Sequence, residues 1–216
     1  MTLGGDAERC QDVIMPDSPR TYGGVDGSAR IAERRRTLVE AGLDLLGTAK
    51  PDLTVRGVCR RAGVVSRYFY ESFADRDALM EAVYDHVVDD VAAIALDAVA
   101  AAPKDDRERV RAGIRAIVRA VAEDPRRGFL LFSATTVGDI LVAKRAESTK
   151  MFAHLLATQA TEFYGTTRDH NLDLTSHFVV GGFAQVLTAW LGGELELSEE
   201  TIVDRCTELL LAASPM

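Results

Sequence analysis

The residues best suited to chemistry lie in the segment TVRGVCRRAGVVSRYFYESF, residues 54–73. Near its end, polar side chains surround two phenylalanines, Phe69 and Phe73, at a spacing that turns the phenylalanines inward on a helix. An arginine can bond bidentately to guanine, and a tyrosine can contact a phosphate or a thymine methyl. The segment therefore predicts a surface that binds duplex DNA through Ser66, Arg67, Tyr68 and Tyr70.

Some of these side chains have an alternative role. Arg67 also fits a solvated position or a bond to a phosphate, which positions a protein on DNA without specifying the sequence. Tyr70 also fits the edge of a core, with only its hydroxyl in water. Three further residues stand near predicted helix starts and are expected to clamp phosphates: Thr54, Arg56 and Arg76.

Two short helices must position these side chains. Thr54 is a residue type that caps helices, which predicts a helix over 55–61. Gly63 suits the left-handed turn that ends it, and Ser66 is expected to cap a second helix over 66–72. Two short helices joined by a glycine-containing turn form a helix-turn-helix, whose second helix enters the major groove.

Basic side chains are concentrated on this part of the chain. The 216 residues carry a formal charge of −8, which excludes a uniformly basic nucleic-acid-binding coat. Residues 30–73 nevertheless hold nine basic and five acidic side chains, a net +4, so the remainder carries −12. A basic segment on an acidic remainder suits phosphate binding, which supplies most non-specific affinity for DNA. The run Arg34–Arg36 within the segment is more typical of a solvated helix face.

Spaced residues over about 30–80 match a known pattern: Ala41-Gly42, Leu45-Leu46, Thr54-Val55, Val58-Cys59, Ala62-Gly63-Val64, Phe69-Tyr70, Phe73, Arg76 and Leu79. In these positions the chain resembles the TetR family of bacterial transcriptional regulators. It departs from the pattern at Val65, where serine is usual, at Ser66, one place later, and at Arg76, where lysine is common. The resemblance implies a homodimer on a palindromic double-stranded DNA operator, released by a small-molecule inducer.

Helical periodicity continues along the rest of the chain. Helices are expected over about 28–48, 76–101, 105–123, 126–143, 147–164, 172–192 and 198–213. No stretch alternates long enough to predict a strand. The predicted fold class is therefore all-α, with about nine helices. Three parts are expected: a flexible N-terminal arm (1–28), a three-helix DNA-binding domain with the helix-turn-helix (29–76), and a larger helical domain for ligand binding and dimerisation (77–216).

The larger domain contains aromatic residues at helical spacing, which most often form a core. Apolar pockets between helices are nevertheless where such domains bind small molecules. The candidate pocket residues are Phe129, Phe132, Thr135, Phe152, His154 and Trp190. Because the region shows no cluster of charge suited to burial, an apolar ligand is favoured.

The last two expected helices carry the features of a subunit interface. The helix over 172–192 has small residues such as Gly181 and Gly182, which permit close backbone approach, and the helix over 198–213 has a narrow apolar stripe. Pairing both with a second copy predicts a four-helix bundle about a two-fold axis. The alternative is that these stripes face the subunit's own core.

Other classes of function find little support in the sequence. The start lacks the features of a signal peptide, and no apolar run approaches the roughly 18–20 residues needed to span a bilayer, so a cytoplasmic protein without membrane contact is expected. The four histidines and three cysteines form no catalytic or metal-binding motif, so no enzyme activity, metal or cofactor is expected. The alternative to a DNA-binding regulator is a helical small-molecule-binding protein without operator-specific DNA binding.

Overall fold

The computed structural model describes residues 27–133, 138–165 and 167–213. These residues form helices and no strand, which confirms the all-α prediction. The nine helices of this described part are α1 (Gly27–Leu46), α2 (Val55–Ala62), α3 (Ser66–Ser72), α4 (Arg76–Ala101), α5 (Asp106–Glu123), α6 (Pro125–Phe132), α7 (Asp139–Tyr164), α8 (His170–Leu191) and α9 (Glu199–Ala213). The expected N-terminal arm lies, except for residues 27 and 28, outside the described residues.

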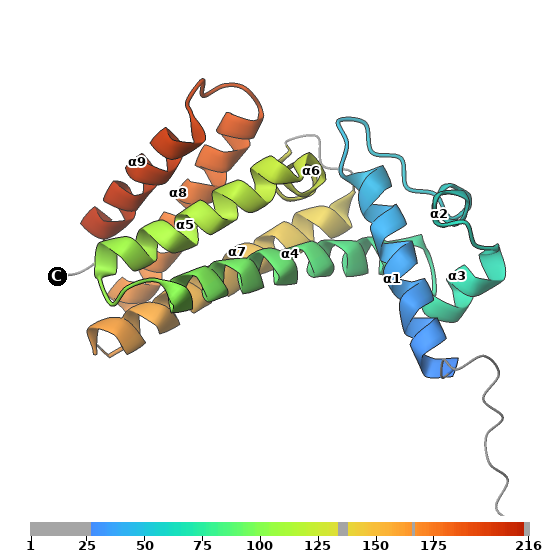
Figure 1. Ribbon diagram of the computed structural model, residues 1–216, viewed down its shortest axis with the longest axis horizontal. Helices are drawn as coiled ribbons and strands as arrows, with labels where there is room; N and C mark the ends of the chain where they lie inside the picture. The colour runs from blue at the N-terminus through green and yellow to red at the C-terminus, as the bar shows by residue number, and fades with distance from the viewer. Residues whose placement is uncertain (1–26, 134–137, 166, 214–216) are drawn as a thin grey trace, which may run out of the picture.

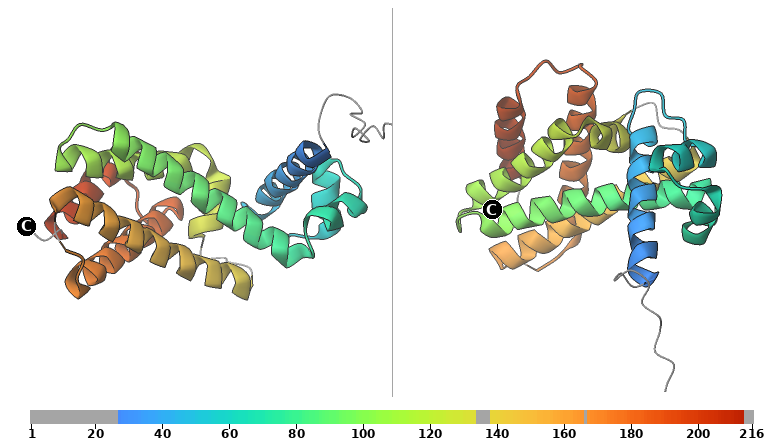
Figure 2. Two further views of the ribbon diagram at one scale, coloured as in Figure 1. Left: turned by 90° about the horizontal axis from the view of Figure 1, so that it is seen from below. Right: turned by 45° about the vertical axis from the view of Figure 1, so that its right-hand side comes forward.

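Helices α1, α2 and α3 gather at one end of the molecule, which we call the head (Figure 1). Helices α4–α9 form the longer part, which we call the body. Helix α4 begins beside the head and extends through the body, with α5 and α7 alongside it. Figure 2 shows the head as a small group of helices joined to the body mainly through α4.

Local capping explains why the head helices begin and end where they do. The Thr54 hydroxyl accepts a hydrogen bond from the Gly57 amide at 3.1 Å, and Gly63 ends α2 in the left-handed region with φ 69°. Asp75 caps α4 through a bond from the Ala78 amide at 2.8 Å. The expected cap at Ser66 is wrong, because Val65 occupies the N-cap position of α3 and Ser66 is already helical.

Two clusters of buried apolar side chains hold the helices together. The larger cluster is centred on Leu38, Phe69 and Leu79 in and beside the head, and it continues along α4 to α6 and α7. The smaller cluster packs α5, α8 and α9 through residues such as Val118 and Leu187. The head therefore shares its core with the N-terminal half of α4, while α8 and α9 depend on α5.

The division between α6 and α7 differs from the sequence prediction. One helix was expected over 126–143 and the next over 147–164, but α6 ends at Phe132 and α7 begins at Asp139. The physical reason is Gly138, which precedes α7 with φ 87°, a conformation outside the helical region. The charged residues at 144–147, where a break was expected, lie within α7.

Helix α8 is the one helix in the described part of the chain that is long and apolar enough to cross a membrane by length and composition alone. The expectation that no stretch meets this criterion is therefore wrong. The criterion is met because α8 contains glycine, alanine, valine and leucine with few charges. The same composition suits a helix that packs against protein, so α8 by itself is weak evidence for a membrane.

Candidate nucleic-acid interface and ligand cavity

Helix α3 separates its polar and apolar side chains as the sequence predicted. Phe69 and Phe73 are buried, with their ring centroids 5.8 Å apart. Tyr68 and Tyr70 are exposed, and the side chain of Arg67 is 84% exposed. Because the two phenylalanines fix the helix from behind, α3 presents a rigid outer face with hydrogen-bonding groups.

Arginines of α1 contact α3 and support this outer face. The sequence analysis did not predict these contacts. The guanidinium of Arg34 lies 4.3 Å from the centroid of the Tyr68 ring, and it pairs with Glu71 at 3.5 Å. Arg35 lies 4.2 Å from the centroid of the Phe73 ring and donates to the Ser72 carbonyl at 2.8 Å. The run of arginines had suggested a solvated face, since only the crossing of α1 and α3 reveals these cation–π contacts.

Arg67 is held along the surface of its own helix. Its Nε donates to a carboxylate oxygen of Glu71, four residues later, at 3.1 Å. An exposed ion pair of this kind contributes little stability, about 0.3–0.5 kcal/mol on a helix. Arg67 can therefore exchange Glu71 for a base edge or a phosphate at small cost.

The residues expected to clamp phosphates lie at helix starts. The Thr54 hydroxyl accepts a bond as the cap of α2, and its O–H remains able to donate. Arg56 is exposed in the first turn of α2, and Arg76 is exposed at the start of α4, where it donates to Asp77 at 3.0 Å. Ser66 is exposed in the first turn of α3. Their role in DNA binding remains a prediction.

The body contains a cavity of about 630 Å³ between α4, α5, α7 and α8. Its walls are mostly apolar and include Phe132 and Phe152, two of the six residues expected at a ligand pocket. Thr135 lies outside the described residues. A volume in this range suits a small organic ligand.

The other three expected pocket residues do not line this cavity. Phe129 is exposed on α6, three residues before Phe132, and is absent from the cavity lining. His154 is exposed, with its Nδ1 2.8 Å from an Arg168 nitrogen. Trp190 packs against the smaller core, and its indole N–H donates to the Leu197 carbonyl at 2.9 Å.

Three polar residues of the cavity lining, Tyr84, Ser148 and Arg145, are connected by hydrogen bonds. The hydroxyls of Tyr84 on α4 and Ser148 on α7 lie 2.8 Å apart. Arg145 also lines the cavity and donates to the Ser133 carbonyl at 2.7 Å and the Leu130 carbonyl at 2.8 Å. Burial raises the pKa of Tyr84 and lowers the pKa of Arg145 because it disfavours the charged form of each.

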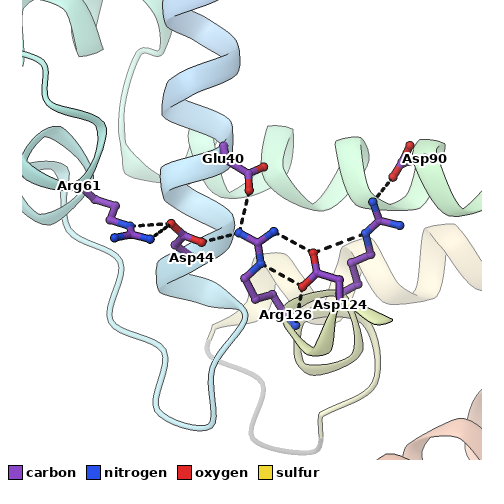
Figure 3. A network of polar contacts seen from close by, with 7 residues as sticks. Glu40, Asp44, Arg61, Asp90, Asp124 and Arg126 are labelled. Atoms are coloured by element: carbon purple, nitrogen blue, oxygen red, sulfur yellow. Dashed lines mark hydrogen bonds and ion pairs between the residues drawn. The ribbon is translucent and has the colours of Figure 1, made fainter. Parts of the chain in front are cut away.

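A network of ion pairs joins α6 to the head (Figure 3). Arg126 extends from α6 to Glu40 on α1 at 2.7 Å, to Asp44 on α1, and to Asp124 at 2.8 Å. Asp44 also binds Arg61 of α2 at 2.5 Å, so this one carboxylate contacts arginines from two helices.

The charges of this network shift the pKa values of its carboxyl groups. The hydrogen bond from Arg126 lowers the pKa of Asp124. Burial raises the pKa of Asp44, but hydrogen bonds from Arg126 and Arg61 outweigh it, and the net pKa is lowered. Both carboxylates are therefore stabilised in their charged forms by the arginines they contact.

Backbone packing reinforces the network at the end of α1. A Cβ atom placed on Gly47 would lie 2.5 Å from the Cβ and 2.7 Å from the carbonyl oxygen of Arg126. Arg127 continues the connection, because it pairs with Asp90 of α4. Helix α6 therefore contacts both the head and α4, while its C-terminal end borders the cavity.

In the described part of the chain, no group of three or more His, Cys, Asp or Glu side chains is arranged to hold a metal ion. Cys59 and Cys206 are both buried free thiols.

No family model matches the sequence, and no curated protein matches it. Solved structures with the same fold are found. A TetR-family transcriptional regulator from Streptomyces coelicolor superposes with a TM-score of 0.67 at 18% identity, over 84% of this chain and 80% of that one. The fatty acid degradation regulator FadR from Bacillus halodurans has a TM-score of 0.67 at 15% identity, over 82% of this chain and 94% of that one.

FadR from Bacillus subtilis, solved in complex with stearoyl-CoA, has a TM-score of 0.64 at 14% identity, over 82% of this chain and 98% of that one. The chain therefore has the fold of TetR-type transcriptional regulators. At these identities the likeness concerns the fold, and at that level it confirms the resemblance that the sequence motif predicted.

Proposed function

We propose that this protein is a ligand-responsive, DNA-binding transcriptional regulator of the TetR type, a cytoplasmic repressor rather than an enzyme. The observation that supports this most directly is the outer face of α3, where Arg67, Tyr68 and Tyr70 are exposed over buried phenylalanines. A short helix anchored in this way suits insertion into the major groove. Thr54, Arg56, Ser66 and Arg76 then supply contacts to phosphates on either side.

The repressor would act as a homodimer formed through α8 and α9. Both helices expose large apolar side chains: Leu174 and Phe178 on α8, the latter 76% exposed, and Leu209 on α9. Gly181 and Gly182 lie one turn after Phe178, and a Cβ on either would meet nothing within 4 Å. An exposed apolar face with adjacent glycines suits close packing against its own copy about a two-fold axis. Two copies of α3 would then contact half-sites of a palindromic operator about 34–36 Å apart.

Helix α6 offers the route by which a ligand would alter DNA binding. Its C-terminal carbonyls bind Arg145 at the cavity, and its N-terminal Arg126 binds α1 of the head. Suppose that α6 can adopt two positions. A ligand that binds more tightly to the protein with α6 in one of them shifts the conformational equilibrium toward that position. Because α1 packs on α3 and α4, movement of α6 would change the separation of the two α3 helices in a dimer.

The inducer would be a small, largely apolar molecule held in the cavity of about 630 Å³. One protein with this fold, FadR of B. subtilis, was solved in complex with stearoyl-CoA. The apolar walls here are suited to a ligand with a comparable apolar portion.

Selection of bound sequences from a random duplex library tests the proposal. The full chain, stripped of bound small molecules, is incubated with the library at near-physiological salt. We expect a palindromic motif to be enriched. In Arg67→Ala, discrimination at the contacted base pair should fall roughly 5- to 150-fold per half-site, the equivalent of about 1–3 kcal/mol.

Arg107→Ala is the matched control, because Arg107 is an exposed arginine on α5, away from the head. It should leave the enriched motif unchanged. Failure of a folded, dimeric protein to enrich any motif would contradict the proposal and favour a small-molecule-binding protein without operator-specific DNA binding.

A further inference from the structure

The cavity in the body reaches the surface of the molecule at helix α8. Two of its lining residues, Gly181 and Gln185, lie four residues apart on this helix, and both are exposed. Gly181 has no side chain, and a Cβ atom placed on it would meet nothing within 4 Å. At this position the wall is therefore only helix backbone, and no described side chain fills the space beside it. We call this place the α8 opening.

The α8 opening borders the apolar face through which we propose that the dimer forms. Exposed Phe178 precedes Gly181 by three residues and Gln185 by seven, so all three lie along one side of the helix. Phe178 itself is absent from the cavity lining. On α9, exposed Leu209 is followed by Leu210, which does line the cavity. On both helices, residues of the apolar face are thus adjacent to residues of the lining.

The absence of charge on this face favours a second copy of the chain as its cover. Residues 174–191 contain no Asp, Glu, Lys or Arg. The chain carries a net charge of −8, so two copies repel one another, and this repulsion is weakest where neither copy presents a charge. A partner of opposite charge would find no ion pair here, whereas a second copy offers the same uncharged, apolar face.

A second group of exposed lining residues lies away from this face. Leu96 on α4 and Asp106 on α5 are both exposed and line the cavity on either side of the α4–α5 connection. A second copy that covers the α8 opening would therefore leave this end of the cavity as the route by which a ligand enters.

We propose that the ligand site is incomplete in a single subunit, and that α8 of a second copy closes it at Gly181 and Gln185. This inference rests on the proposed function, because it takes the dimer to form through α8 and α9. A ligand enclosed by both copies binds the dimer more tightly than the monomer, and by linkage it strengthens the dimer. The inducer would then release DNA by changing the separation of the two α3 helices, with the subunits still associated.

Binding of a neutral fluorescent probe tests this inference without DNA. N-phenyl-1-naphthylamine, whose emission rises in apolar surroundings, is titrated with the full chain and with Phe178→Arg, which we expect to be monomeric. The monomer should bind the probe roughly 10-fold more weakly. A factor of ten corresponds to about 55 Å² of apolar surface returned to water. Leu209→Arg, which breaks the same interface from α9, should show the same loss.

The reciprocal measurement separates closure by a second copy from a local effect of the substitutions. Sedimentation velocity of the wild type over a dilution series gives the dimer dissociation constant with and without saturating probe. Because each dimer has two sites, a tenfold preference at each should tighten this constant roughly 100-fold. Val142→Arg is the matched control, since Val142 is exposed on α7 and lies outside both the lining and the apolar face. It should remain dimeric and bind the probe as the wild type does.

Equal probe affinity in the dimer and in the monomeric variants, or a dimer constant that the probe leaves unchanged, would overturn the inference. Variants that remain dimeric would place the interface elsewhere and overturn it too. A wild type that binds no probe would do the same, because the cavity would then be closed in solution. Selection of a palindromic motif by the same protein would in each case leave the proposed regulator intact. Linked probe binding and dimerisation in a protein that selects no DNA motif would support the inference and contradict the proposed function.

Discussion

In the head, Leu38, Val58 and Phe69 are fully buried and fill the space between three short helices. In the body, by contrast, Phe152 and Leu156 line a cavity of about 630 Å³. The difference matches the task proposed for each part. A surface that contacts DNA must keep its side chains in fixed positions, and a filled interior provides that rigidity. A site that accepts a ligand must leave room between its helices, so its stability comes from elsewhere, here from the packing of α5 on α8 and α9.

The largest effect on operator affinity is expected from a substitution in the body. It acts on DNA binding by the head only because it prevents dimerisation. Phe178→Arg places a charge in the apolar face of α8, so the protein should become monomeric. Light scattering measures this change in mass. Linking two binding modules raises affinity by about 10²–10⁴-fold, and operator affinity should fall by a comparable factor.

Val142→Arg is its control, because Val142 is also an exposed apolar residue but lies on α7. A Phe178→Arg protein that remained dimeric, or that bound the operator normally as a monomer, would contradict the proposed interface.

Truncation of one side chain in each part compares their packing directly. Phe69→Ala should reduce the free energy of unfolding by about 3–5 kcal/mol, because it opens a void in a filled core. Leu156→Ala enlarges a cavity that already exists, and its cost should stay below about 2 kcal/mol, the lower end for a buried leucine. Urea denaturation followed by circular dichroism measures both. Equal losses would mean that the cavity is closed in solution.

The contact between the head and α6 can be altered by adding a single carbon atom. Gly47→Ala introduces a Cβ against the backbone of Arg126, and we expect it to cost about 1–3 kcal/mol in stability, as overpacking does. Because it pushes α6 away from α1, operator affinity without inducer should also change. Gly27→Ala provides the comparison, since a Cβ there meets nothing within 4 Å. Unchanged stability and affinity in Gly47→Ala would argue against α6 as the connection.

The smallest expected effect is on the pH dependence of the free energy of unfolding. The folded-state pKa of Asp44 lies below its ordinary value, so its contribution to stability is present above about pH 4 and is lost as the pH falls through the folded pKa. Asp44→Asn should therefore be less stable than the wild type by about 1 kcal/mol at pH 7, and this difference should shrink toward pH 3. Urea midpoints at the two pH values measure it. A difference that stays constant with pH would exclude the charge of Asp44 as its cause. Asp97→Asn, an exposed carboxylate of α4, should show a smaller difference.

The two parts also differ in how well the sequence predicted them. In the head, the cap at Thr54, the turn at Gly63 and the buried faces of Phe69 and Phe73 were all anticipated, because each depends on neighbours within a few residues. The support that Arg34 gives to Tyr68 was missed, since it depends on how two helices cross.

In the body the helices were found, but their connections and the cavity were less accessible to sequence reasoning. The break before Gly138 was placed several residues late, because apolar and small residues continue through it. Phe129 and Phe132 are both phenylalanines, about one helical turn apart. Only the packing of α6 decides which of them lines the cavity. The contribution of Arg145 depends on the carbonyl groups at the end of another helix, which no local pattern reveals.

The position of Asp44 between Arg61 and Arg126 has an evolutionary consequence. A substitution at this one residue removes partners from two arginines at once, one in the helix-turn-helix and one on α6. Arg126 keeps Glu40 and Asp124 as partners when Asp44 is lost, whereas Asp44 is the ion-pair partner of Arg61 in this network. Among descendants of this protein, position 61 should therefore vary together with position 44, and Arg126 should tolerate loss of the acid at position 44 as long as Glu40 and Asp124 are retained.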